Sequence, residues 1–543
     1  MTNTYELICQ MKPYIQPFEC TLALKELEAL AGASPIPLTN QNPRTATYYV
    51  ISQSTSAYLA SRLAYWELVY PTGGDPSAGL LTRQVRHEAT TNLVRNGAKA
   101  GELQRQLPFI EWVPLPRRRN LRYGTHGIHE YRGKFFPQLV RSLLNISGAS
   151  RDSTVLDPMC GSGTTLVEAI LLGCQAIGVD LNPLSVLMSR AKCNALSIHP
   201  DQLLDEYETL RADLLALSPS QRNGLPWFEH LPSQDQDYLS RWFAPKVLAD
   251  LDPIATRVHD TVDSSCRALF QMSLSNILRP VSWQKNDDLR VRKDKLTHVD
   301  TDVMTVFLTE LNRSVNAVLA FLYENQECEV GEVSIIEDDI RLADQRLSHL
   351  AGRIDIVITS PPYATALPYL DTDRLSLCYL GLLPRPEHRS RERDMIGNRE
   401  ITNGQRLDYW EEYKLRKREL PSEITTVIDR IDELNRNSDV GFRRRNKAAL
   451  LARYFLDMRK VFENFQLLLR PSAPAYVVVG NNYTVAGGQR VDIETNRLLA
   501  HLGESVGLAL GETISMEMLV SRDIFKKNTG SAETILAFRN SQS

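Results

Sequence analysis

The sequence predicts an α/β fold built on a doubly wound parallel sheet, and two segments carry that prediction. In the first, the pattern predicts a strand at Val155–Asp157, a glycine-rich turn, a helix at Leu166–Leu172 and a second strand at Ala176–Asp180. In the second, the apolar run Ile354–Ile358 predicts a buried parallel strand, which a Pro-Pro pair ends. Strands that alternate with helices in this way indicate a nucleotide-binding type of sheet.

Length and composition set the limits of the interpretation. The chain has 543 residues, enough for two or three domains with a substantial core. It has neither a run of about 18 apolar residues nor a signal peptide, so we expect a cytoplasmic location and no membrane contact. The eight cysteines are scattered, and His126 and His129 have no further ligand candidates nearby, so we expect no metal site and no disulfide framework.

The N-terminal 1–80 are predicted to form a small α+β domain, because short strands and helices alternate there. The expected strands are Tyr5–Cys9, Ala46–Ser52 and Glu67–Tyr70, and the expected helices are Leu22–Leu30, which Gly32 ends, and Ser56–Tyr65. Residues 81–124 are expected to be a linker.

The core is predicted to lie in two blocks. Residues 125–195 form the cofactor-binding half, and the polar, helical stretch 196–330 is too long for a simple connection, so it is predicted to be an insertion. Residues 331–543 form the catalytic half, with a charged, substrate-facing insertion at 383–447. The elements expected in this half are strands at Glu332–Ile336, Ala475–Gly480, Glu512–Leu519 and Glu533–Phe538, and a helix at Leu450–Leu469.

The glycine-rich turn suits a nucleoside cofactor. Its glycines let the backbone approach a ligand, and Asp180 at the end of the next strand can accept hydrogen bonds from ribose hydroxyls. No Gly-Lys-Ser/Thr follows, so the turn is not a P-loop. The dinucleotide pattern is incomplete, because Leu166 stands where its last glycine would be.

The loop Thr359-Ser360-Pro361-Pro362-Tyr363 offers a hydroxyl, a free backbone carbonyl and an aromatic face in one stiff turn. These groups can hold a planar base that carries an exocyclic amine. The alternative interpretation is an ordinary turn that ends a strand.

Together, Asp-Pro-Met-Cys-Gly-Ser-Gly-Thr and Thr-Ser-Pro-Pro-Tyr resemble the signature motifs of amino-methyltransferases that use S-adenosylmethionine. The second motif is most similar to that of the DNA cytosine-N4 enzymes, although some adenine-N6 enzymes carry it. The segment Tyr131–Leu139 resembles the part of these enzymes that packs on the cofactor. The resemblance covers roughly Thr125–Asp180 and Glu332–Phe538, and it implies a Rossmann-like, doubly wound sheet of about seven strands that closes with an antiparallel pair.

The resemblance also implies the site residues. The implied cofactor residues are Phe135, Phe136, Pro137, Asp157, Pro158, Cys160, Gly161, Gly163, Thr164, Asp180, Asn182 and Asp339. Ser360, Pro361, Pro362 and Tyr363 are implied to act on the target base. In the family, an acidic residue after the strand at Glu332–Ile336 faces the adenine amine. Asp339 fits that place better than Asp338, and either carboxylate could instead be a helix N-cap.

The implied reaction is transfer of a methyl group to a base amine in DNA, most simply cytosine N4, and adenine N6 is an alternative. Ring-carbon methylation would need a Pro-Cys nucleophile, which the chain lacks. Segments Leu24–Leu30 and Leu59–Tyr65 resemble tRNA guanosine-N2 methyltransferases, but those enzymes usually carry Asp where Ser360 stands. A cofactor fold kept only as a nucleic-acid-binding scaffold is the third possibility.

The net charge of −3 argues weakly against a nucleic-acid partner, but the basic residues are clustered. The clusters are Arg117, Arg118, Arg119 and Arg122; Lys285, Arg290, Arg292, Lys293 and Lys295; Arg385, Arg389, Arg391 and Arg393; and Arg443, Arg444, Arg445 and Lys447. Each could be a solvated loop, but together they predict a surface that contacts phosphates. The chain carries no nuclease motif, so any partner nuclease of a restriction-modification pair is not encoded in it.

Overall fold

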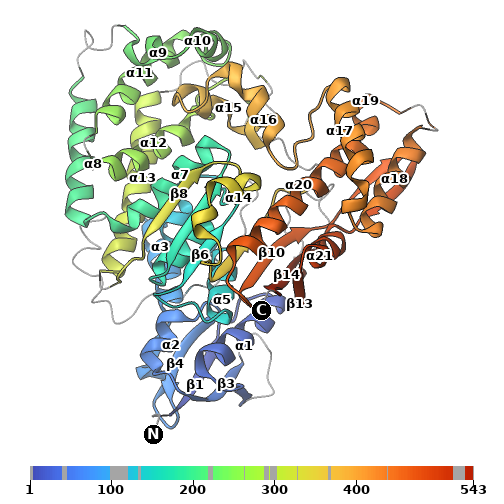
Figure 1. The fold of residues 1–543 in the computed structure, drawn as a ribbon. Coiled ribbons are helices and arrows are strands. Elements are labelled where there is room, and N and C mark those ends of the chain that lie inside the picture. The colour runs from blue at the N-terminus through green and yellow to red at the C-terminus, as the bar shows by residue number, and fades with distance from the viewer. Residues whose placement is uncertain are drawn as a thin grey trace.

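The computed structural model consists of a small N-terminal sheet, a central sheet and two helical regions (Figure 1). It describes residues 4–38, 46–97, 116, 120–131, 136–217, 224–261, 263–285, 293, 302–326, 328–364, 369–436, 438, 440–517 and 532–541. None of the helices in these ranges has the length and apolar character needed to span a bilayer.

The N-terminal unit is a five-stranded sheet in the order β2-β3-β1-β4-β5. Its elements are β1 (Tyr5–Met11), α1 (Pro17–Ala31), β2 (Ile36–Pro37), β3 (Thr47–Ser52), α2 (Ser56–Arg62), β4 (Trp66–Pro71) and β5 (Leu80–Leu81). Helix α1 ends at Gly32, whose φ of 76° is the left-handed C-cap that glycine favours. The predicted strands and helices are confirmed, but α2 stops before Tyr65 because Leu63 is not helical, with ψ 130°.

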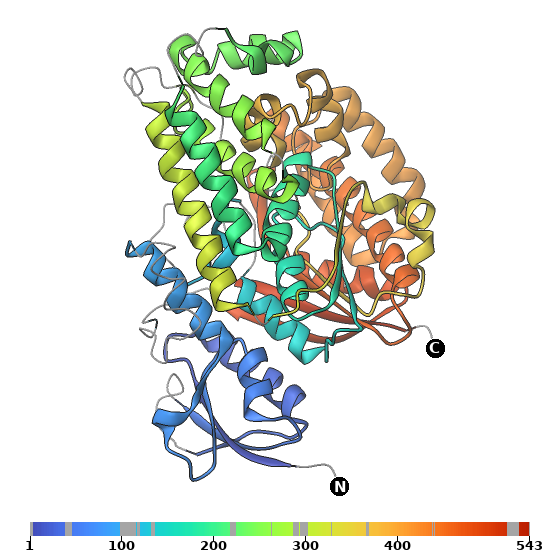
Figure 2. The ribbon, with the colours of Figure 1, turned by 90° about the vertical axis from the view of Figure 1, so that its left-hand side faces the viewer.

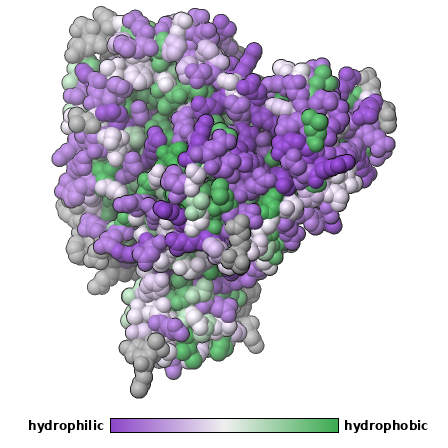
Figure 3. Space-filling view, viewed as in Figure 1, coloured by the Kyte–Doolittle hydropathy of each residue, from purple (hydrophilic) through white to green (hydrophobic). Residues whose placement is uncertain are grey.

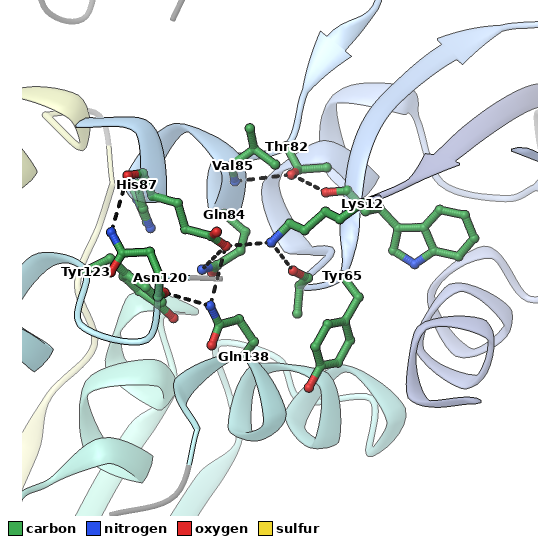
Figure 4. Close-up of polar contacts among 12 residues, drawn as sticks. Lys12, Tyr65, Thr82, Gln84, Val85, His87, Asn120, Tyr123 and Gln138 are labelled. Carbon is green, nitrogen blue, oxygen red and sulfur yellow. Dashed lines mark hydrogen bonds and ion pairs between the residues drawn. The ribbon is translucent and has the colours of Figure 1, made fainter. Parts of the chain in front are cut away.

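The expected linker 81–124 contains a helix that is part of the folded body, α3 (Arg83–Arg95). The buried Lys12, just after β1, donates a 2.7 Å hydrogen bond to Glu88 of α3. Gln138 of α5 (Pro137–Ile146) donates to the same carboxylate at 3.4 Å. Figure 4 shows how Lys12 and Gln138 converge from the N-terminal unit and the core. Because α3 is buried through paired polar groups, its sequence has little of the apolar periodicity that would have predicted it.

The central sheet has seven strands in the order β13-β14-β10-β9-β6-β7-β8. They are β6 (Thr154–Asp157), β7 (Gln175–Asp180), β8 (Val333–Glu337), β9 (Ile356–Thr359), β10 (Pro474–Gly480), β13 (Leu508–Glu517) and β14 (Ala532–Asn540). The five strands from β8 to β10 are parallel, and β14 runs antiparallel to both β10 and β13. This confirms the predicted doubly wound sheet with a closing antiparallel pair.

The strand order reverses between β6 and β9. From β6 the chain moves outward through β7 and β8, and it then returns to β9 on the other side of β6. In open sheets of this kind, ligands bind at the reversal point, outside the carboxyl ends of the strands. The two signature motifs follow β6 and β9, so the topology brings them together.

Helices cover both faces of the sheet. The core helices are α5 (Pro137–Ile146), α6 (Thr164–Leu171), α7 (Pro183–Asn194), α20 (Lys447–Leu468) and α21 (Thr495–Ser505). In β9, Ile356 and Ile358 belong to the hydrophobic cluster of α5 and α6, whereas Val357 belongs to the cluster of α20 and α21. Burial on both faces explains why this strand is a continuous apolar run.

Between α7 and β8 the described residues are largely helical, as expected for 196–330. The helices are α8 (Pro200–Leu215), α9 (Pro226–His230), α10 (Ser233–Ser240), α11 (Pro245–Asp260), α12 (Ser264–Leu278) and α13 (Val303–Glu324). They share one hydrophobic cluster with α7. Figure 2 shows this layer in green, above the blue N-terminal unit.

A second helical region follows β9. Its helices are α15 (Tyr369–Tyr379), α16 (His388–Asp394), α17 (Asn403–Arg416), α18 (Ser422–Arg436) and α19 (Phe442–Arg445). Helices α17 and α18 pack against α20, and together with α19 they form a lobe at one side of the molecule (Figure 1). A hairpin that the sequence analysis did not predict, β11 (Asn482–Ala486) and β12 (Gln489–Ile493), turns at Gly487 and Gly488, where both φ values are positive.

Candidate functional site

A pocket lies at the reversal point of the sheet. It is lined by residues that follow β6, β7, β8 and β9, and it holds about 910 Å³ of space, part of it open to solvent. Ten of the sixteen predicted site residues line it: Pro158, Cys160, Gly161, Thr164, Asp180, Asp339, Ser360, Pro361, Pro362 and Tyr363. The fold therefore brings the two signature motifs to one cavity.

Asp180 connects the end of β7 to the glycine-rich turn. Its Oδ2 accepts a 2.8 Å hydrogen bond from the Gly161 backbone N–H, and its Oδ1 accepts one of 2.8 Å from the Asn182 N–H. Burial raises the pKa of the Asp180 carboxyl to about 6. Each carboxylate oxygen has a further lone-pair site, so Asp180 can also accept hydrogen bonds from ligand hydroxyls.

The two glycines of the turn serve different contacts. Gly161 has a φ of 49°, and a Cβ there would lie 2.9 Å from Cε1 of Tyr131, so a side chain would collide with that ring. Gly163 has a φ of 76°, and its Cβ would lie 2.8 Å from Oγ of Ser189. Gly161 and Tyr131 both line the pocket, so the missing side chain at Gly161 leaves room for that ring. Gly163 instead lets the turn pack closely on α7.

Ser162 is a pocket residue that the prediction omitted. It is 2% exposed, and its Oγ has no hydrogen-bond partner among the residues that the structure describes. A buried hydroxyl of this kind needs a partner, and a polar ligand in the pocket can supply one. The unpaired hydroxyl, the acceptor Asp180 and the side-chain-free Gly161 fit a nucleoside cofactor.

Five predicted residues support the pocket without lining it: Phe136, Pro137, Asp157, Gly163 and Asn182. Asp157 is buried, and its Oδ1 accepts a 3.3 Å hydrogen bond from the Met159 N–H, which shapes the turn. Asn182 caps α7 by accepting from the Leu184 N–H at 3.1 Å. Phe136 and Pro137 begin α5, and Phe135 lies outside the described residues.

Both carboxylates after β8 line the pocket. Asp339 caps the short helix η6 (Ile340–Leu342) by accepting from the Arg341 N–H at 3.0 Å, and it pairs with the Arg341 guanidinium at 2.6 Å. Asp338 pairs with Arg346. The capping alternative is thus confirmed for Asp339, and its place in the pocket wall leaves the ligand-binding prediction open.

The loop after β9 is held by three other parts of the chain. The Tyr363 hydroxyl donates to the Glu533 carboxylate of β14. A Cβ at Gly480 of β10 would lie 3.2 Å from Cε2 of Tyr363, and one at Gly397 would lie 3.1 Å from Cβ of Pro362. These contacts fix the loop at the mouth of the pocket.

Besides Ser162 and Asp338, six lining residues were not predicted as site residues: Tyr131, Met159, Leu181, Ile340, Met395 and Ile396. Tyr131 begins the segment Tyr131–Leu139, which resembles the cofactor-packing part of amino-methyltransferases, so the sequence did carry a signal for this residue. Met395 and Ile396 follow α16, inside the charged insertion, and no local pattern marks them. Only the packing of that insertion over the Pro-Pro loop brings them to the pocket.

The two histidines considered as a metal pair have separate partners. His126 is buried and shares a 2.8 Å hydrogen bond with Glu168, whereas His129 contacts the Ser275 hydroxyl at 2.9 Å. Burial opposes ionisation of Glu168, but the neighbouring Arg141 and His126 hold its pKa at about 2. Among the described residues, no group of three or more His, Cys, Asp or Glu side chains could hold a metal ion.

The basic clusters differ in their surroundings. Arg443, Arg444 and Arg445 are exposed on α19. Arg391 instead pairs with Glu337 at 2.9 Å and donates to the Leu181 carbonyl at 2.7 Å. The predicted members Arg117, Arg118, Arg119, Arg290, Arg292 and Lys295 lie outside the described residues. On α19, three exposed arginines therefore follow one another in the chain.

Residues 129–199 match the family UPF0020, described as "RMKL-like, methyltransferase domain". The chain is 25% identical to the Type II methyltransferase M.MvaI of Kocuria varians over 70% of this chain and 82% of that protein. It is 23% identical to the Type II methyltransferase M.BsoBI of Geobacillus stearothermophilus over 48% of this chain and 54% of that protein.

A shorter match concerns a tRNA (guanine(10)-N2)-dimethyltransferase of Methanothermobacter thermautotrophicus, which is 32% identical over 15% of this chain and 23% of that protein. Among solved structures, the rRNA methyltransferase aviRa from Streptomyces viridochromogenes matches 76% of this chain and 89% of that chain with a TM-score of 0.28 and 11% identity. That structural similarity is too low to support a fold assignment, which rests on the strand order. The matched family and relatives show that the chain carries a methyltransferase domain, with S-adenosylmethionine as the methyl donor.

Proposed function

We propose that this S-adenosylmethionine-dependent methyltransferase methylates an exocyclic base amine in DNA, with cytosine N4 as the target at a specific site. One observation carries the proposal: a single pocket joins the glycine-rich turn and Asp180 to the Ser360–Tyr363 loop. The similarity to two proteins named Type II methyltransferases supports the choice of DNA.

On the cofactor side, Asp180 would accept hydrogen bonds from the ribose hydroxyls, and Asp339 would accept one from the adenine amine. Ser162 would hydrogen-bond the cofactor through its otherwise unpaired hydroxyl. When bound, S-adenosylmethionine supplies an electrophilic methyl group on its sulfonium. The protein positions the cofactor, because the Gly161 backbone and the Tyr131 ring fix one wall of the pocket.

On the base side, the Ser360 hydroxyl and the Pro361 carbonyl would accept hydrogen bonds from the target amine. The lone pair of that amine is conjugated with the ring, so acceptors out of the ring plane favour a more tetrahedral, more nucleophilic nitrogen. Tyr363 would stack on the base, and its tether to Glu533 keeps the ring at the pocket mouth. Orientation and local electrostatics, rather than a strong base, would drive the transfer.

A second candidate is methylation of guanosine N2 in tRNA. The short match to a tRNA (guanine(10)-N2)-dimethyltransferase favours it, and the Ser-Pro-Pro-Tyr loop disfavours it. Adenine N6 in DNA is the closest chemical alternative, because the same acceptors would hold that amine.

Product analysis tests the proposal directly. The protein is incubated with methyl-labelled S-adenosylmethionine and either duplex DNA or tRNA, and the labelled nucleosides are identified by mass spectrometry. We expect N4-methylcytosine in DNA. Label only in N6-methyladenine would overturn the choice of base, and label only in N2-methylguanosine of tRNA would replace DNA with the second candidate.

A further inference from the structure

An exposed aromatic side chain stands beside three exposed arginines on α19. Phe442 is 52% exposed, and Arg443, Arg444 and Arg445 follow it in the same short helix. We call these four residues the α19 patch. A single exposed hydrophobic side chain is common on protein surfaces and by itself indicates nothing. The inference depends on its arginine neighbours and on its position.

The backbone of the α19 patch is anchored, although its side chains face outward. The Asn435 side chain, which is 6% exposed, donates a 2.8 Å hydrogen bond to the Arg444 carbonyl. Asn446 is 2% exposed and donates to the Ile401 carbonyl at 3.5 Å. The patch is therefore presented from a fixed position. Figure 3 shows that the lobe of α17–α19 is mostly hydrophilic, with small hydrophobic spots.

A short segment of chain links the α19 patch to the base side of the pocket. Arg443 pairs with Glu400 at 3.5 Å, and Glu400 is three residues from Gly397, which packs against Pro362 of the loop. Three residues of extended chain span at most about 11 Å. The intervening segment belongs to the same stretch as Met395 and Ile396, which line the pocket. The Arg443–Glu400 pair and the segment from Glu400 to Gly397 therefore connect α19 to the part of the chain that covers the Pro-Pro loop.

We propose that Phe442 is a wedge that inserts into the DNA duplex beside the target base, while Arg443, Arg444 and Arg445 contact the flanking phosphates. A base that enters the pocket must leave the stack, and an apolar side chain between base steps compensates for the lost stacking. The three positive charges next to the ring complement the phosphates on either side. This inference rests on the proposed function, because it requires a base in a duplex as the substrate.

The test compares two variants on two duplexes. Phe442→Ala removes the wedge, and Leu415→Ala is the matched control. Leu415 is 84% exposed on α17, and the neighbouring Lys414 and Arg416 are ion-paired with Glu411 and Glu412. One duplex carries a site at which the wild-type protein places labelled methyl groups, and the other carries the same site with the target base mismatched. A mismatched base costs less to extrude.

We expect Phe442→Ala to lower the methylation rate on the paired duplex by roughly tenfold, the scale of one lost stacking contact. On the mismatched duplex its rate should stay within about twofold of wild type, because that base is already unstacked. Leu415→Ala should match wild type on both, and all variants should bind S-adenosylmethionine equally. The variant Phe442→Trp, which keeps an aromatic ring, should methylate the paired duplex at the wild-type rate.

Three results would overturn the wedge: an unchanged rate in Phe442→Ala, an equal loss on both duplexes, or an equal loss in Leu415→Ala. Each of these leaves the proposed function intact, because the wild-type protein methylates the paired duplex in all of them. If the wild-type protein methylates tRNA and no DNA, the proposed function fails, and the wedge fails with it.

Discussion

The Tyr363 hydroxyl donates a hydrogen bond to the carboxylate of Glu533, a residue 170 positions away in the sequence. Tyr363 belongs to the loop after β9, and Glu533 lies in β14, the antiparallel strand next to β10. The bond crosses β10, whose Gly480 leaves space for the tyrosine ring. The proposed base-stacking residue is therefore positioned by the closing strands of the sheet.

The first prediction concerns this bond. Glu533→Ala should lower turnover about fivefold, because a hydrogen bond to a charged acceptor is worth roughly 1 kcal/mol when partly exposed. Tyr363→Phe should cause a similar loss. The double variant should lose no more than either single one, and additive losses would show that Glu533 acts independently of Tyr363. S-adenosylmethionine affinity, measured by calorimetry, should be unchanged throughout.

Ser360→Ala should slow methyl transfer about tenfold, because one acceptor for the target amine is lost, a contact of roughly 1–1.5 kcal/mol. Tyr363→Ala should lose a stacking contact of about 1–3 kcal/mol. Single-turnover kinetics with labelled cofactor measure both effects, and thermal unfolding should show an intact fold. Full activity in the Ser360, Tyr363 double variant would remove this loop from the mechanism.

Asp180→Ala should weaken S-adenosylmethionine binding by about 1–3 kcal/mol, the value of charged hydrogen bonds. Part of the loss is expected from the turn itself, because Asp180 also accepts from the Gly161 backbone. Asp157→Asn is a useful comparison, since Asp157 shapes the turn from outside the pocket lining and should have a smaller effect. Unchanged affinity in Asp180→Ala, measured by calorimetry, would contradict the assignment.

Cofactor affinity should depend on pH through Asp180. Its pKa in the free protein is raised to about 6 by burial, and hydroxyl donors from the cofactor favour the ionised form, so binding lowers this pKa. Affinity should therefore be constant well above pH 6 and should fall as the pH drops through about 6, approaching tenfold per pH unit. Calorimetry from pH 5 to pH 8 tests this, and Asp180→Asn should remove most of the dependence.

Changing Arg443, Arg444 and Arg445 together to Gln should flatten the salt dependence of DNA binding. Each phosphate contact contributes about 0.9 to the slope of log affinity against log salt, so the slope should decrease by up to about 2–3. The control variant changes Lys414 and Arg416 of α17, two cations outside the α19 patch. If the slope of the triple variant equals that of wild type, these arginines are part of a solvated surface.

Much of the fold and most of the site could be predicted from the sequence alone. The run Ile354–Ile358 and the turn at Pro158–Thr165 are local patterns, since an apolar run predicts a buried strand and the glycines predict a tight turn. The order of the two motifs then places both at the reversal of a doubly wound sheet, where the pocket is found. Ten of the sixteen predicted residues line that pocket because their backbone segments end at the same edge.

Other features were decided only by the tertiary structure. Helix α3 is held by the buried pair Lys12 and Glu88, and a pair of this kind leaves no periodic signal in the sequence. Glu533, Met395 and Ile396 reach the site through long-range packing, so nothing in their local sequence marks them. Local patterns specify strands and turns because those depend on near neighbours, whereas the side chains that meet across the pocket depend on how distant elements pack.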